Sequence, residues 1–180
     1  STRVRRMLKS TSYRGRRQRH NPKTVLQNLR VLLAEDISML RKVISRVLEH
    51  QGATVVAVAD GEQAVQRIRE STFAPNDNER FDVVLMDLNM PNLDGLGATR
   101  RVVEDAELQQ RHPPPIIGLT ADVGMHAATE FLNAGADGVA GKPIEMEKLQ
   151  QTIALVLDAD ANTNTSNSEN DDDDDDDGTH

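Results

Sequence analysis

Short runs of Val, Leu and Ile alternate along the middle of the chain with longer segments whose apolar residues recur every three or four positions. A short apolar run predicts a buried strand, and the longer spacing predicts an amphipathic helix. The pattern predicts strands at 31–34, 54–58, 81–86, 116–119 and 138–141, and helices at 36–50, 63–69, 96–108, 125–134 and from 143 onward. Repeated strand–helix units predict an α/β fold with a parallel sheet and helices on both faces.

The first and last predicted helices carry the clearest apolar stripes. For the first, Asp36 or Ser38 is the expected N-cap. Its expected inward residues are Leu40, Val43, Ile44, Val47 and Leu48. The last helix is expected to begin at Pro143, with an apolar stripe made of Ile144, Leu149, Ile153, Leu155 and Val156. Both stripes should pack against the sheet.

The formal net charge of −8 conceals an uneven distribution of charge, which divides the chain into three parts. Residues 1–30 contain Arg and Lys but no acid, and residues 158–180 contain acids, including the run Asp171–Asp177, but no base. Blocks of like charge repel themselves and stay solvated. We therefore predict a basic disordered arm or linker at 1–28, a folded domain at 29–158 and an acidic disordered tail at 159–180. A nucleic-acid role for the arm is less favoured than a linker, because no aromatic residues for base stacking are interleaved with its charges.

Composition excludes several classes of protein. The chain has no Cys, so neither disulfides nor thiolate metal sites are available. It has no apolar stretch of about 18 residues or more, so no membrane segment is predicted in this chain. These features fit a cytoplasmic location, with a nuclear one left open. The missing initiator Met suggests that the chain was cut from something longer or was processed.

Polar side chains stand where the predicted strands end. Glu35 and Asp36 follow the first strand, Asp87 ends the third, Thr120 ends the fourth and Lys142 follows the fifth. Because ligands bind at the carboxyl ends of parallel strands, we expect these groups to converge. Three neighbouring carboxylates stay ionised only if a cation neutralises them. Oxygen ligands favour Mg²⁺, or Mn²⁺ in its place.

This constellation suits phosphoryl transfer. Asp36 and Asp87 are the expected direct metal ligands, Glu35 binds through water, and the backbone carbonyl of Asn89 adds a ligand. A carboxylate such as that of Asp87 can attack phosphorus and form an acyl phosphate. Lys142 would neutralise the phosphoryl oxygens, and Thr120 would hydrogen-bond the group once it arrives. Phosphatases that use an Asp nucleophile in this way place a second Asp two residues later. Asn89 stands there instead, so sustained turnover of small phosphoesters is not expected.

The residues Glu35-Asp36, Asp87-Leu88-Asn89-Met90-Pro91, Thr120-Ala121 and Lys142-Pro143 resemble the signature of response-regulator receiver domains over about residues 29–158. The resemblance implies a flavodoxin-like doubly wound (βα)5 fold with strand order 2-1-3-4-5. It also implies that Asp87 is the phosphoacceptor of a two-component phosphorelay, with a histidine kinase or a histidine phosphotransfer protein as partner. Such a domain catalyses its own Mg²⁺-dependent phosphorylation and, slowly, its own dephosphorylation.

Two features bear on the output of such a receiver. Val139 stands three residues before Lys142, where the family often has an aromatic residue coupled to the switch hydroxyl, so a rotating aromatic is not implied here. The segment Leu85–Gly95 is similar to receivers at the carboxyl ends of hybrid sensor histidine kinases, which makes a fragment of such a kinase the favoured reading. A stand-alone response regulator and a phosphorylation-independent binding module are the alternatives.

Overall fold

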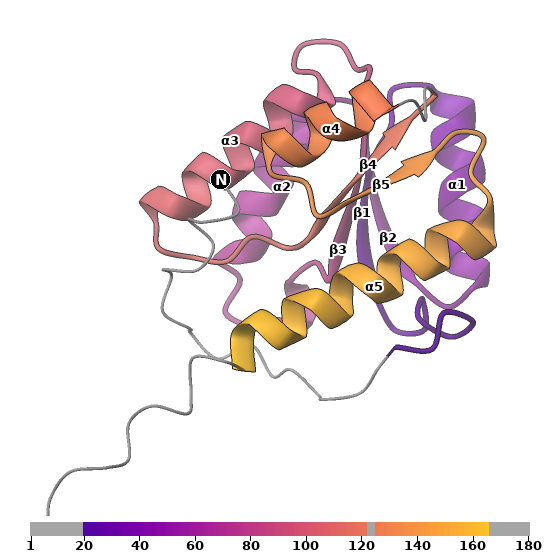
Figure 1. Ribbon diagram of the computed structural model, residues 1–180, viewed down its shortest axis with the longest axis horizontal. Coiled ribbons are helices and arrows are strands. Elements are labelled where there is room, and N and C mark those ends of the chain that lie inside the picture. Colours follow the sequence, from indigo (N-terminus) through magenta and orange to yellow (C-terminus); the bar gives the residue numbers. More distant parts are fainter. Residues whose placement is uncertain (1–19, 122–124, 166–180) are drawn as a thin grey trace, which may run out of the picture.

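The computed structural model describes residues 20–121 and 125–165. Within them the chain forms one parallel sheet whose strands are β1 (Arg30–Ala34), β2 (Thr54–Val58), β3 (Val83–Asp87), β4 (Ile116–Thr120) and β5 (Gly138–Gly141). The helices are α1 (Ser38–His50), α2 (Gly61–Thr72), α3 (Gly95–Leu108), α4 (Met125–Ala134) and α5 (Met146–Thr165), with a 3-10 turn η2 (Asp77–Glu79). The strand order is β2-β1-β3-β4-β5, which confirms the predicted flavodoxin-like fold (Figure 1).

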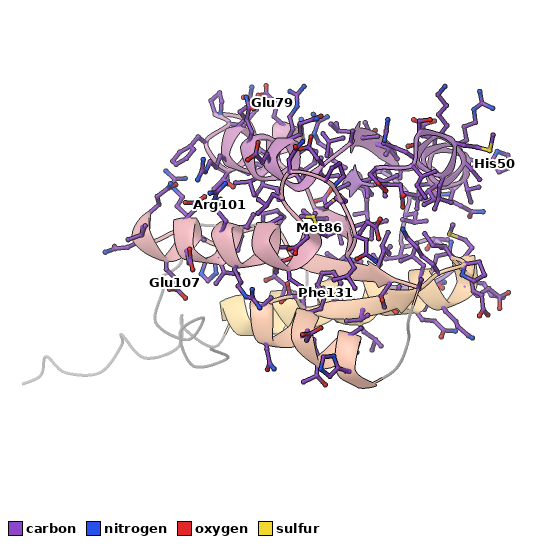
Figure 2. All side chains as sticks on the ribbon, turned by 90° about the horizontal axis from the view of Figure 1, so that it is seen from above. His50, Glu79, Met86, Arg101, Glu107 and Phe131 are labelled. Carbon is purple, nitrogen blue, oxygen red and sulfur yellow. The ribbon has the colours of Figure 1, made fainter. Side chains whose placement is uncertain are left out.

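Helices cover both faces of the sheet (Figure 1). Successive side chains of a strand point to opposite faces. In β1, Val31 and Leu33 therefore join the cluster under α1 and α5, whereas Leu32 and Ala34 join the cluster under α2, α3 and α4. Figure 2 shows Met86 and Phe131 inside the molecule, while Glu79, Glu107 and His50 lie at its periphery.

Burial within the sheet follows strand position. Every residue of β3 and β4 is buried, whereas the edge strands β2 and β5 are only partly covered. Strands buried on both faces read as continuous apolar runs, which is why the central strands stand out in the sequence. The carboxyl ends of β1 and β3 lie side by side in parallel register, so residues that follow them meet at one edge of the sheet.

The prediction for α1 was partly wrong. Its N-cap is Ile37, without a side-chain capping hydrogen bond, rather than Asp36 or Ser38. Val43 and Val47, expected to face inward, are 52% and 39% exposed. The helix lies over the side of the sheet where β2 forms the edge, so only a narrow stripe containing Ile44 and Leu48 meets the strands.

The prediction for α5 was also partly wrong. The helix begins at Met146 instead of Pro143, and Ile144 packs against the core from the preceding loop. Leu155 is 71% exposed. A helix turns by about 100° per residue, so Leu155 points roughly 200° away from Ile153, which faces the sheet.

The ordered fold extends beyond the boundaries expected at residues 29 and 158. Val25 and Leu26 belong to the core cluster under α1 and α5, because the basic segment contains an apolar pair that the charge pattern obscured. His20 contacts α5, with its backbone N–H donating to Asp158 Oδ1 at 3.0 Å and its Nδ1 2.7 Å from the same oxygen. The helix itself continues to Thr165. The disorder predicted for residues 1–19 and 166–180 lies outside the described residues.

No helix in the described part of the chain has both the length and the apolar character needed to cross a bilayer.

Candidate functional site

Three carboxylates meet at the carboxyl ends of β1 and β3. Glu35, Asp36 and Asp87 each present an oxygen within 4.8 Å of the other two. Glu35 is fully buried and Asp87 is 4% exposed, whereas Asp36 is more open to solvent. The parallel register of β1 with β3 brings these residues together, as the sequence predicted.

Lys142 binds two of these carboxylates. Its Nζ lies 2.6 Å from Glu35 Oε2 and 2.8 Å from Asp87 Oδ1, and its side chain is 15% exposed. Burial opposes the charged ammonium and would lower its pKa. The hydrogen bonds and negative charges of Asp87 and Glu35 outweigh this effect and raise the pKa of Lys142. The side chain is therefore a fixed positive charge beside the candidate phosphoacceptor.

Thr120 and Lys142 are joined through the backbone. Thr120 is 1% exposed at the end of β4, and its carbonyl accepts a hydrogen bond from the Lys142 N–H at 2.7 Å. On the other side of β4, the Leu88 N–H donates a hydrogen bond to the carbonyl of Leu119 at 3.0 Å. The ends of β3, β4 and β5 are thus tied together, which places the predicted hydroxyl and ammonium beside the strand that carries Asp87.

The loop after β3 is anchored on α2. Asp60 is the N-cap of α2, where its Oδ1 accepts from Gln63 N–H at 2.8 Å. Its Oδ2 also accepts from Asn92 Nδ2 at 3.2 Å. Next to it, Gly61 N–H donates to the carbonyl of Leu93 at 3.1 Å. These bonds hold the loop, a role that the sequence did not reveal for Asp60 beyond that of a turn or cap residue.

Hydrogen bonding lowers the pKa of Asp60. The main cause is the bond from the Gln63 backbone, with further contributions from the side chains of Gln63 and Asn92, while burial works in the opposite direction. The carboxylate of Asp60 therefore stays charged and keeps both contacts at neutral pH.

Asn89 lies two residues after Asp87 and is exposed. The structure places it in the loop that follows β3, close in sequence to the acidic cluster. The use of its backbone carbonyl as a metal ligand stays a prediction.

Sequence reasoning missed Arg41. Its Nη1 donates to the carbonyl oxygen of Glu35 at 2.5 Å and to that of Asp36 at 3.0 Å. The only signal in the sequence was spacing, because a long side chain at the end of the first helical turn can reach back over the residues that precede the helix.

The carboxylate cluster fits a hard divalent cation. Its ligands are all oxygens, two of the three side chains are buried, and Lys142 alone supplies less positive charge than the three acids carry. Mg²⁺ prefers a small number of carboxylates combined with water and phosphate oxygens. The open side at Asp36 leaves room for such ligands, so the residues present match the cation that the sequence implied.

Known proteins match this chain across the part that carries the site. Residues 31–154 match the family model described as the response regulator receiver domain. Histidine kinase 1 of Arabidopsis thaliana is 32% identical over 153 residues, which cover 71% of this chain and 13% of that protein. Hybrid signal transduction histidine kinase I of Dictyostelium discoideum is 35% identical over 124 residues, covering 69% of this chain and 7% of that protein. The chain thus spans a small part of the length of these relatives.

Solved structures give the same picture. The receiver domain of an Arabidopsis thaliana histidine kinase, in complex with Mg²⁺ and BeF3−, is 26% identical with a TM-score of 0.65, over 75% of this chain and 93% of that one. The receiver domain of a Pseudomonas aeruginosa sensor histidine kinase, with a magnesium ion in its active-site cleft, is 32% identical with a TM-score of 0.56. That match covers 72% of this chain and 97% of the other.

Proposed function

The chain belongs to the response regulator receiver domain family, and from this premise we propose that Asp87 accepts a phosphoryl group from a phosphohistidine. The observation that carries the proposal is the convergence of three carboxylates within 4.8 Å of one another, two of which pair with the partly buried Lys142. An isolated Asp at a strand end is usually a turn or cap residue. Asp87 instead lies between an ammonium and two acids that match the preferences of a divalent cation.

In the proposed reaction a carboxylate oxygen of Asp87 attacks phosphorus while the bond between phosphorus and the donor imidazole nitrogen breaks. The electron pair of that bond stays on the histidine, and the product is an acyl phosphate. Glu35, Asp36 and Asp87 would hold Mg²⁺, with Mn²⁺ as the alternative ion, and the carbonyl of Asn89 would add a ligand. The cation supplies charge neutralisation for the phosphoryl oxygens.

Lys142 and Thr120 complete the proposed site. Lys142 contacts Asp87 Oδ1 at 2.8 Å, so its ammonium is in place to pair with an oxygen of the arriving phosphoryl group. Thr120 would donate its hydroxyl to the product and carry the change to β4 and α4. Hydrolysis of the acyl phosphate would be slow, because Asn89 stands where phosphatases of this type use an acid.

The partner must cover the edge of the sheet to reach Asp87. Helix α1 begins just after the acidic pair, and it exposes a row of apolar side chains made of Met39, Val43 and Val47; its N-cap, Ile37, is exposed as well. An apolar patch of this kind beside a reactive group marks a protein-binding surface. We propose that the phosphohistidine-bearing partner, a histidine kinase or a histidine phosphotransfer protein, docks there.

The similarity to hybrid kinases supports a place for this receiver within a longer histidine kinase, with a stand-alone response regulator as the alternative. We propose that it works in the cytoplasm, where a kinase can draw on ATP, or in the nucleus. Mass measurement of the natural full-length product from its source would distinguish the two architectures.

Intact-mass measurement with acetyl phosphate tests the phosphoryl transfer. With Mg²⁺ or Mn²⁺ the native chain should gain one phosphoryl group, and the Asp87→Asn variant should gain none. Asp94→Asn is the matched control, because Asp94 is an exposed cap of α3 in the same loop and should leave labelling intact. Equal labelling of the native chain and Asp87→Asn would refute the assignment. A native chain that takes no label with either ion would favour a phosphorylation-independent binding module.

A further inference from the structure

Arg41 closes the first turn of α1, and its guanidinium reaches back over the segment between β1 and α1. One nitrogen, Nη1, donates to the carbonyl oxygens of Glu35 at 2.5 Å and of Asp36 at 3.0 Å. Two successive carbonyls that share one donor have a fixed orientation relative to each other. These peptides carry two of the three carboxylates of the candidate cation site.

Glu35 has further anchors besides Arg41. Its backbone N–H donates to the carbonyl of Val58 at 3.1 Å. Its carboxylate accepts from Ile37 N–H at 3.2 Å and from Lys142 Nζ at 2.6 Å. Three hydrogen bonds therefore fix the position of Glu35, and the bond from Arg41 is a fourth.

Asp36 depends much more on Arg41. Among the described residues its carboxylate has no hydrogen-bonding partner, and α1 begins without a side-chain cap that would fix the turn. The direction of the Asp36 side chain is thus set by its backbone, and the Arg41 guanidinium holds the carbonyl of that residue.

We propose that Arg41 is a positioning residue for the divalent cation. By fixing the peptides of Glu35 and Asp36, it keeps their carboxylates close to Asp87 before the cation arrives. This inference rests on the proposed function, because it concerns the ion that phosphoryl transfer requires. Arg41 acts through geometry rather than through charge, since its positive group would by itself oppose a cation. A Lys ammonium has donors for the same two carbonyls, but it would reach them only by ordering its flexible stem and losing water, because it lacks the pre-organised planar guanidinium.

Calorimetric titration of the full chain with Mg²⁺, without any phosphodonor, tests the inference. Arg41→Gln and Arg41→Lys should each weaken Mg²⁺ affinity by about tenfold or more, the usual effect of losing a group that orients metal ligands. Arg46→Gln is the matched control, because Arg46 is an exposed residue of the same helix, and its Mg²⁺ affinity should equal that of the native chain. At saturating Mg²⁺, labelling by acetyl phosphate should reach the native rate in both Arg41 variants.

A structural role for Arg41 would give a different result. Thermal unfolding without Mg²⁺ should show Arg41→Lys folded, with a transition close to that of the native chain. Native Mg²⁺ affinity in Arg41→Gln would overturn the proposal, as would loss of the folded domain in both variants. Native affinity in Arg41→Lys alone would show that any donor nitrogen suffices, and it would overturn the requirement for the guanidinium.

The two proposals fail in distinguishable ways. A native chain that binds Mg²⁺ and becomes labelled, alongside Arg41 variants that bind Mg²⁺ equally well, sinks only the role of Arg41. A native chain that neither binds Mg²⁺ nor accepts a phosphoryl group sinks the proposed function and this inference together.

Discussion

At the scale of single residues, Lys142 has a structural role in addition to the chemical one proposed for it. It is the partner of the fully buried Glu35 carboxylate. Lys142→Met should lower the free energy of unfolding by about 3 kcal/mol in the absence of Mg²⁺, because it leaves a buried charge unpaired. Urea unfolding measures the change. Lys148→Met is the control, since Lys148 is 73% exposed in its pair with Glu145 and its loss should cost little.

The raised pKa of Lys142 also determines the pH range over which its ion pair stabilises the folded domain. A group whose pKa is higher in the folded state stabilises the protein fully below its unfolded pKa, here 10.5. The contribution declines only as the pH rises through the folded value. At neutral pH the ion pair should therefore be complete, and a destabilisation by Lys142→Met that vanished at pH 7 would contradict this description.

The lowered pKa of Asp60 predicts that its contribution to stability is lost at low pH. Its pKa lies below the ordinary value of 3.8, so its contribution to stability is present above the unfolded pKa and is lost as the pH falls through the folded value. Asp60→Asn should destabilise the domain by about 1 kcal/mol at neutral pH, because a charge-assisted cap is weakened. Urea unfolding at a series of pH values should show the difference from the native chain shrinking in acid. A difference that stayed constant into strong acid would exclude this role.

At the scale of secondary-structure elements, α4 is fitted to β4 through one glycine. A Cβ added at Gly118 would lie 2.5 Å from the ring of the fully buried Phe131. Gly118 pairs with Val139 of β5, the position at which the resemblance leads one to expect an aromatic residue. The aromatic ring packed against this part of the sheet thus belongs to Phe131 of α4 and not to a residue of β5. Gly118, which it contacts, lies two residues before Thr120 in β4.

This fit can be tested by a double-mutant cycle. Gly118→Ala should cost about 1–3 kcal/mol by overpacking, and Phe131→Leu should cost about 1 kcal/mol through lost packing. The double variant should be more stable than the sum of the two changes predicts, because the smaller side chain makes room for the new methyl group. Urea unfolding of the four proteins gives the coupling energy, and strict additivity would show that the two residues do not share space.

At the scale of the whole molecule, the segment before β1 is part of the core. Leu26 is fully buried, although the charge pattern assigned it to the arm. Leu26→Ala should lower the free energy of unfolding by about 3 kcal/mol. Leu108→Ala is the matched control, because Leu108 is 84% exposed on α3, and thermal unfolding should show little change for it. Equal stability of the two variants would place Leu26 outside the cooperative unit.

Predictability from sequence also depends on scale. The convergence of Glu35, Asp87 and Lys142 followed from strand ends, because parallel topology brings such ends to one edge. The strand order was instead implied by the resemblance to receiver domains. Helix faces were predicted less well: Val43 and Val47 fit a helical period, but the period does not say how wide a stripe the sheet covers. The role of Arg41 could not be predicted, because it contacts backbone carbonyls, and every residue has one whatever its side chain.

The full burial of β3 has a consequence for hydrogen exchange. Amides in the central strands β3 and β4 should exchange most slowly, and those in the partly covered edge strands β2 and β5 should exchange faster. Asp87 ends one of the two slow strands. If Asp87 is the phosphoacceptor, as proposed, its carboxylate on this rigid strand should stay in place, so exchange rates after phosphorylation should change around β5 and the helices and hardly at all along β3.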